Sequence, residues 1–198
     1  MITIGSDAFV ASDGKANRGL QPIVFPRNLA VLEPYSLRGL DLIRAIDLRD
    51  TSIRHLGPHA LAGPIAVTAI SPPHVLESIS ASAWPRSNSV SMLDFRDTRL
   101  VELPTNGLVG LQITRLFFPT TLTRIRSDAF NGTSIDGTGV DGFSETLLAA
   151  NVTVLERHAF RSLDSISVLK PPNAVQAIEP DAFPSGALSL VEMDLSGT

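Results

Sequence analysis

Residues 119–130 read Pro-Thr-Thr-Leu-Thr-Arg-Ile-Arg-Ser-Asp-Ala-Phe, and the spacing within this stretch recurs along most of the chain. A proline stands eleven residues before Phe130, apolar residues stand eight and five before it, and a small residue directly precedes it. The large residues of such small–large pairs are Phe9, Leu37, Leu61, Trp84, Leu108, Phe130, Phe160 and Phe183. Their spacing is 22–24 residues except at two places, where it is 28 and 30. This period predicts a repeat protein whose units stack into one elongated core.

The two apolar positions are independent of the small–large pair that defines the repeat. Five residues before the large residue stand Ile4, Leu32, Leu56, Ile79, Leu103, Ile125, Leu155 and Ile178. Eight residues before it stand Met1, Leu29, Ile53, Leu76, Leu100, Leu122, Val152 and Val175. With 43% hydrophobic residues, the fourteen matches in the seven full units have a chance probability on the order of 10⁻⁵. We therefore expect both positions to point into the interior of each coil.

A turn residue eleven positions before the large residue alternates between two kinds. Proline occupies it as Pro26, Pro73, Pro119 and Pro172, and aspartate occupies it as Asp50 and Asp97. Pro26 and Pro73 are 47 residues apart, as are Asp50 and Asp97, so two units form a super-repeat. Apolar residues alternate just before the turn, as in Ile46 and Leu48, which predicts a short β-strand. Proline or aspartate then ends the strand, and the large residues, like every other aromatic side chain, are predicted to fill the core.

Two segments of the chain, residues 125–130 and 155–160, resemble BspA-type leucine-rich repeats. Such units begin with a proline followed three residues later by Leu or Val, as in Pro119-x-x-Leu122 and Pro172-x-x-Val175. The resemblance implies an α/β-type solenoid, a right-handed and β-rich coil with short strands and short helical turns. About eight rungs of about 23 residues would form a single domain over residues 1–198. It also implies adhesion or protein recognition, at a cell surface or after secretion. The family's usual cysteine after the large residue is replaced by Thr133, Leu163 and Gly186.

Composition excludes several classes of function. The 198 residues carry 16 Lys and Arg against 20 Asp and Glu, and this net charge of −4 gives no attraction to nucleic acid. No apolar run approaches the roughly 18 residues of a membrane span, so we expect no membrane insertion within this segment. The absence of Cys excludes disulfides, thiol nucleophiles and cysteine-based zinc sites. We expect no cofactor.

Catalytic and metal-binding groups are not predicted. The four histidines are scattered, and Gly57-Pro58 prevents His55 and His59 from sharing a helix face. His59 and His158 occupy one repeat position, two before the large residue, which we interpret as tolerant and exposed. The Gly-rich insertion within residues 131–146 is interpreted as a turn and not as a calcium loop, because its acidic residues lack the required spacing. The chain is therefore predicted not to be an enzyme.

Two interpretations remain open for the charged residues that repeat near the turns. Asp47, Asp94 and Asp194 share one position, and Arg49 and Arg96 share another. Equivalent members would lie two rungs, roughly 10 Å, apart. They form either a mutually neutralising ladder that supports stacking or a partner-binding strip with arginine as its anchor.

Further expectations concern modification and assembly. Asn131-Gly-Thr is the more plausible of two glycosylation sequons, since Val152 of the other is predicted to be buried. Both ends of the sequence fall inside a unit, so we expect a segment of a longer array. The predicted function is a non-catalytic module that binds a protein or cell-surface ligand. The alternative is a structural spacer, with end-to-end self-association.

Overall fold

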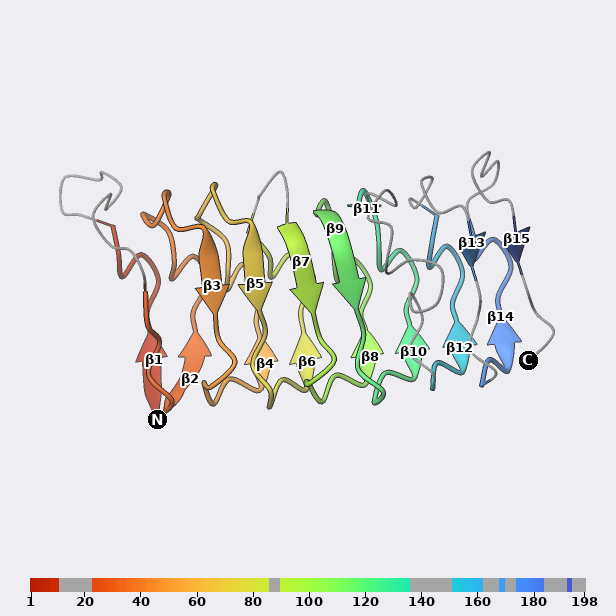
Figure 1. Ribbon diagram of the computed structural model, residues 1–198, viewed down its shortest axis with the longest axis horizontal. Coiled ribbons are helices and arrows are strands. Elements are labelled where there is room, and N and C mark those ends of the chain that lie inside the picture. Colours follow the sequence, from red (N-terminus) through yellow and green to blue (C-terminus); the bar gives the residue numbers. More distant parts are fainter. Residues whose placement is uncertain are drawn as a thin grey trace.

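The computed structural model is an elongated solenoid, and it describes residues 1–10, 23–85, 90–135, 151–161, 168–169, 174–183 and 192–193. Coils stack side by side along the long axis, from the N-terminal end to the C-terminal end (Figure 1). The strands of these coils fall into two sets that run in opposite directions in the figure. The stacking predicted from the repeat is therefore confirmed for the described coils.

The first set of strands ends at the second residue of each apolar pair. It comprises β1 (Ile2–Ile4), β2 (Leu29–Leu32), β4 (His55–Leu56), β6 (Ser78–Ile79), β8 (Glu102–Leu103), β10 (Arg124–Ile125), β12 (Val154–Leu155) and β14 (Ala177–Ile178). These strands form three parallel sheets, β1-β2, β4-β6 and β14-β12-β10-β8. In the largest, equivalent residues are in register, so Ile125 lies opposite Leu103 on one side and Leu155 on the other. All three side chains are fully buried. The sequence placed these residues inward but did not predict that they form strands.

The second set precedes the turn residue. It comprises β3 (Ala45–Asp47), β5 (Ala69–Ser71), β7 (Val90–Asp94), β9 (Gln112–Phe117), β11 (Ser134–Ile135), β13 (Val168–Leu169) and β15 (Glu192–Met193). The first five form one parallel sheet in the order β11-β9-β7-β5-β3. Ile46, Ile70, Leu93 and Leu116 lie opposite one another in this sheet and are buried. The short strand predicted before the turn is thus confirmed for these units, but before Pro26 residues 23–25 form no strand.

None of the described residues lies in a helix, so the short helical turns expected of an α/β class are not found there. The segment around Phe130 shows why. The N–H groups of Ala129, Asn131 and Thr133 each bond to the carbonyl three residues earlier, at 2.9–3.2 Å, so single turns follow one another. Asp128 has a φ of 53°, and one left-handed residue interrupts a right-handed helical path. The chain is a β-solenoid, and its handedness and the number of eight rungs stay predictions.

The left-handed conformation recurs at one repeat position, two before the large residue. Its members are Asp7, Tyr35, His59, Ser82, Asn106, Asp128, His158 and Asp181, with φ between 53° and 60°. Main-chain bonds connect them along the axis, as Tyr35 N donates to His59 O at 3.0 Å. His59 and His158 are half-buried, which corrects the prediction of a fully exposed position. Asn, Asp and His are enriched at positive φ, so backbone conformation accounts for much of the residue choice.

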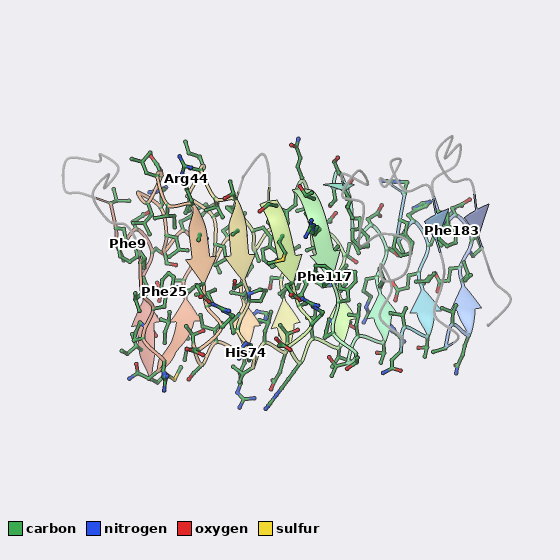
Figure 2. All side chains as sticks on the ribbon, in the orientation of Figure 1. Phe9, Phe25, Arg44, His74, Phe117 and Phe183 are labelled. Atoms are coloured by element: carbon green, nitrogen blue, oxygen red, sulfur yellow. The ribbon has the colours of Figure 1, made fainter. Side chains whose placement is uncertain are left out.

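Aromatic side chains form a chain of contacts through the core. Trp84, Phe95, Phe118, Phe130, Phe160 and Phe183 contact one another in this order, with ring centroids 5.4–6.3 Å apart. The prediction that every aromatic side chain fills the core is wrong for two residues. Tyr35 is 41% exposed and stacks on His59, and Phe117 lies on the outer side of β9 (Figure 2). Strand alternation explains Phe117, because its neighbours Leu116 and Phe118 both point inward.

Candidate functional site

Arg96 is fixed on the outer side of the five-stranded sheet by two partners. Its Nε donates to Asp94 Oδ1 at 3.0 Å, and its Nη2 donates to Asp94 Oδ2 at 2.6 Å. Its guanidinium carbon lies 4.4 Å from the centre of the Phe117 ring, which the next coil supplies. Asp94 and Phe117 lie opposite each other in the register of β7 and β9. The Arg96 side chain is thus held in place although 59% of it is exposed.

Asp47 and Arg49 repeat this pairing at the end of β3. Arg49 Nε donates to Asp47 Oδ1 at 3.0 Å, and Nη2 donates to Oδ2 at 2.6 Å. Ser71 lies opposite Asp47 in β5, where the equivalent partner of Asp94 is Phe117. Arg49 therefore lacks the aromatic support of Arg96.

The structure tests the geometry of the predicted charge strip. The Asp–Arg pairs form within one coil, and β5 separates Asp47 in β3 from Asp94 in β7. A ladder in which these charges bond from coil to coil is not seen among the described residues. Asp194 lies outside the described residues, as do the acidic residues of the Gly-rich insertion after Ile135.

Hydrogen bonding shifts the pKa values of both Asp–Arg pairs. The bond from Arg49 lowers the pKa of Asp47, and the bond from Arg96 lowers the pKa of Asp94, in both cases against an opposing effect of burial. The same bonds raise the pKa of each arginine above its usual value. Both pairs are therefore fully ionised at neutral pH and carry no net charge.

An apolar patch adjoins these pairs on the same side of the sheet. Met92 is 43% exposed and lies opposite Ala69 in β5 and Arg115 in β9. Arg115 has no ion-pair partner among the described residues. We define the sheet face as Ala69, Met92, Asp94, Arg96, Arg115 and Phe117. Sequence reasoning did not identify Met92, Arg115 and Phe117, although alternation around the buried Leu93 and Leu116 could have placed them outward.

Charge ladders between coils do occur, but on the opposite sheet. Arg54 Nη1 pairs with Glu77 Oε1 of the next coil. Arg126 bonds to Glu102 Oε2 at 3.0 Å on one side and to Glu156 Oε1 at 3.4 Å on the other. Ion pairs from coil to coil are thus made by residues other than the Asp–Arg pairs.

Another polar contact among the described residues lies around His55. His55 Nδ1 lies 2.7 Å from Ser78 Oγ, and its Nε2 lies 3.3 Å from Ser80 Oγ, so its ring joins two neighbouring coils. No group of three or more His, Asp or Glu is placed to hold a metal in the described part of the chain. No helix there is long and apolar enough to cross a membrane.

The glycosylation candidate Asn131 lies beside the core. It is half-buried, and its Nδ2 donates to Asn106 Oδ1 at 3.1 Å. Val152 of the other sequon is fully buried, as predicted. Glycosylation of Asn131 stays a prediction.

The repeat and the paired sheets agree with a comparison against protein families. A family model described as the BspA type leucine rich repeat region matches residues 2–136 and 139–198, in six copies. The chain belongs to the BspA-type leucine-rich-repeat family. No curated protein and no solved structure matches it.

One departure from the BspA-type pattern is explained by the structure. Thr133 stands where the sequence analysis expected the family's cysteine, and it is buried. Its Oγ1 donates to Leu108 O of the preceding coil at 2.6 Å. A small side chain with a satisfied hydroxyl therefore fills the position without a thiol.

Proposed function

We propose that this leucine-rich-repeat chain is a non-catalytic protein-binding module, and that the sheet face is where its partner binds. One observation carries the proposal: Arg96 is exposed yet fixed between Asp94 and Phe117. An arginine fixed before binding loses little side-chain freedom in a complex, and arginine and aromatic residues dominate binding energy at protein interfaces.

The surroundings of Arg96 support a protein partner over a small molecule. Met92 and Ala69 supply exposed or half-buried apolar surface, and Arg115 supplies an unpaired positive charge at its border. Apolar centres with methionine, arginine and aromatic residues are enriched in protein interfaces. Asp47 and Arg49 would extend this surface by two strands, and Asp194 belongs to the same proposed strip. Adhesion at a cell surface is the setting that the family resemblance favours.

The proposal is tested by removing both arginines of the strip. The double variant Arg49→Ala/Arg96→Ala is compared with Arg54→Ala/Arg126→Ala, which removes two ion-paired arginines from the opposite sheet. Binding is measured by interferometry against a panel of purified extracellular matrix and plasma proteins. For any protein that binds, we expect the first variant to lose about 30-fold or more in affinity and the second to lose little.

The same variants separate recognition from a structural role. Urea unfolding shows whether the double variant has lost stability, and light scattering shows whether the chain assembles. Loss of stability with intact binding would contradict the proposed surface. Oligomers that lengthen with concentration, without binding to any protein of the panel, would favour the alternative of a self-assembling spacer.

A further inference from the structure

We infer that the free edge of β3 is a docking slot for an extended peptide segment of a protein partner. β3 is the last strand of the five-stranded sheet on its N-terminal side. An unpaired strand edge presents main-chain donors and acceptors that another extended chain can use. The slot is defined by Ile23, Val24 and Phe25 on one side and Ala45 and Asp47 on the other.

The hydrogen bonds to β5 show which groups of β3 are free. Ala69 N donates to Arg44 O at 3.1 Å, and Leu48 N donates to Ser71 O at 2.9 Å. Successive residues of a strand direct their main-chain polar groups to opposite sides. The N–H and C=O of Ala45 and Asp47 therefore point away from β5, and no main-chain bond to another described residue uses them.

A hollow of about 570 Å³ lies against β3. Ala45 and Asp47 line it, and Ile23, Val24 and Phe25 line it from the preceding coil. Residues 23–25 are described and do not form a strand, so they do not pair with the edge of β3. Figure 2 labels two of the lining residues, Phe25 and His74, on either side of the lower end of β3.

The lining indicates the chemistry of the occupant. Val24 is 86% exposed, so a side chain of the docked segment can cover it. Arg49, Asp50 and His74 line the hollow as polar groups. Two free donors and two free acceptors on alternate residues match the main chain of an added strand, and a ligand without a peptide backbone would leave several of them unpaired. The occupant is thus an extended peptide segment.

This slot extends the proposed function, because both surfaces would take a protein partner, but it is a separate site. The sheet face acts through side chains of β7 and β9, whereas the slot acts through the main chain of β3. Arg49 lines the slot and also belongs to the proposed strip, so Arg96→Ala is the variant that changes the sheet face alone and Ala45→Pro is the variant that changes the slot alone. With these two variants the two proposals can fail independently.

Amide hydrogen exchange of the isotopically labelled chain tests the slot directly. In the free protein, we expect the amides of Ala45 and Asp47 to exchange at least tenfold faster than that of Leu48. The probe is the blocked peptide acetyl-Thr-Val-Thr-Val-Thr-Val-Thr-amide, chosen because both residue types favour strands. Saturating peptide should slow exchange of the Ala45 and Asp47 amides at least tenfold.

Two controls separate strand addition from other binding. The same peptide N-methylated at every residue keeps its side chains but has no N–H to donate, and it should bind at least tenfold more weakly. Ala45→Pro removes one outward N–H without breaking a bond to β5, so it should weaken peptide binding at least tenfold while the chain stays folded. Ala69→Pro, at the same register of β5, removes a bonded N–H and should lower the urea midpoint.

Three results would overturn the inference. The first is slow exchange at Ala45 and Asp47 in the dilute free protein, which would show that the edge is already paired. The second is protection that appears only as the protein concentration rises, which would assign the edge to a second copy of this chain. The third is binding that is equal for the peptide and its N-methylated form, or no slowing of exchange at Ala45 and Asp47 at saturating peptide.

Discussion

At the scale of single residues, one left-handed position in each coil bends the chain before the large core residue. Ser82 is the simplest member of this row, with a φ of 58° and no side-chain charge. A left-handed conformation costs an L-residue about 1–2 kcal/mol, and a β-branched side chain fits it worst. We expect Ser82→Val to lower the free energy of unfolding by about that amount and Ser82→Gly to leave it unchanged or slightly higher. Urea denaturation measures both, and equal stability of the two variants would contradict this account.

The Asp94–Arg96 pair gives a second prediction at this scale. The pKa of Asp94 lies below 3.8 in the folded protein, because Arg96 bonds to its ionised form. The pair therefore stabilises the folded state fully above the ordinary aspartate pKa, and this contribution disappears as pH falls through the lowered value. We expect the stability difference between the wild type and Asp94→Asn to shrink between about pH 5 and pH 2. Urea unfolding at several pH values measures it, and Arg96→Gln should remove the same pH dependence.

At the scale of the strand and its turn, buried threonines hold the turn that follows the strand in the aspartate-type units. Thr51 and Thr98 are buried, and their hydroxyls donate to Leu48 O and Phe95 O, both at 2.8 Å. Thr98→Val keeps the shape and removes the hydroxyl, so we expect a loss of about 0.5–1.5 kcal/mol. Thermal and urea unfolding measure this loss. Thr68→Val, at an exposed hydroxyl bonded at 3.3 Å, is the control and should lose less.

At the scale of the whole molecule, the 47-residue super-repeat predicts which deletions the solenoid accepts. Removing residues 50–96 joins Arg49 to Asp97, so an aspartate-type turn still follows β3. We expect this variant to fold with a urea m-value lower by about a quarter, because less surface is exposed on unfolding. Removing residues 50–72 joins Arg49 to Pro73, so the proline stands four residues after the buried Ile46, whereas in its own unit it stands three residues after the buried Ile70.

The single-unit deletion is the matched comparison. We expect it to unfold at a lower urea concentration than the two-unit deletion although it removes fewer residues, because it joins the strand of an aspartate-type unit to the turn of a proline-type unit, with the proline one residue later than in its own unit. Circular dichroism during urea titration measures both midpoints. Equal midpoints would show that the alternation of proline and aspartate units does not affect the stability of the solenoid.

The sequence alone determined the period, the inward positions and the strand before most of the turns, because burial in a stacked array repeats at fixed spacing. Leu103, Ile125 and Leu155 are buried where the repeat placed them. It also indicated the family to which the chain belongs. These features depend on local spacing and on which residues are apolar.

Only the tertiary structure decided which charges pair and which groups stay free. Asp94 and Arg96 are neighbours in sequence, but the ring beneath Arg96 comes from Phe117 in the next coil, so that contact depends on the register between strands. In the sequence, the repeat position with the left-handed conformation could be recognised only as one that accepts different residue types, because residue type alone does not determine backbone conformation. The open edge of β3 depends on a neighbouring segment that forms no strand. The register between strands and the unpaired edge of a sheet arise only when coils stack, so the sequence of a single coil does not determine them.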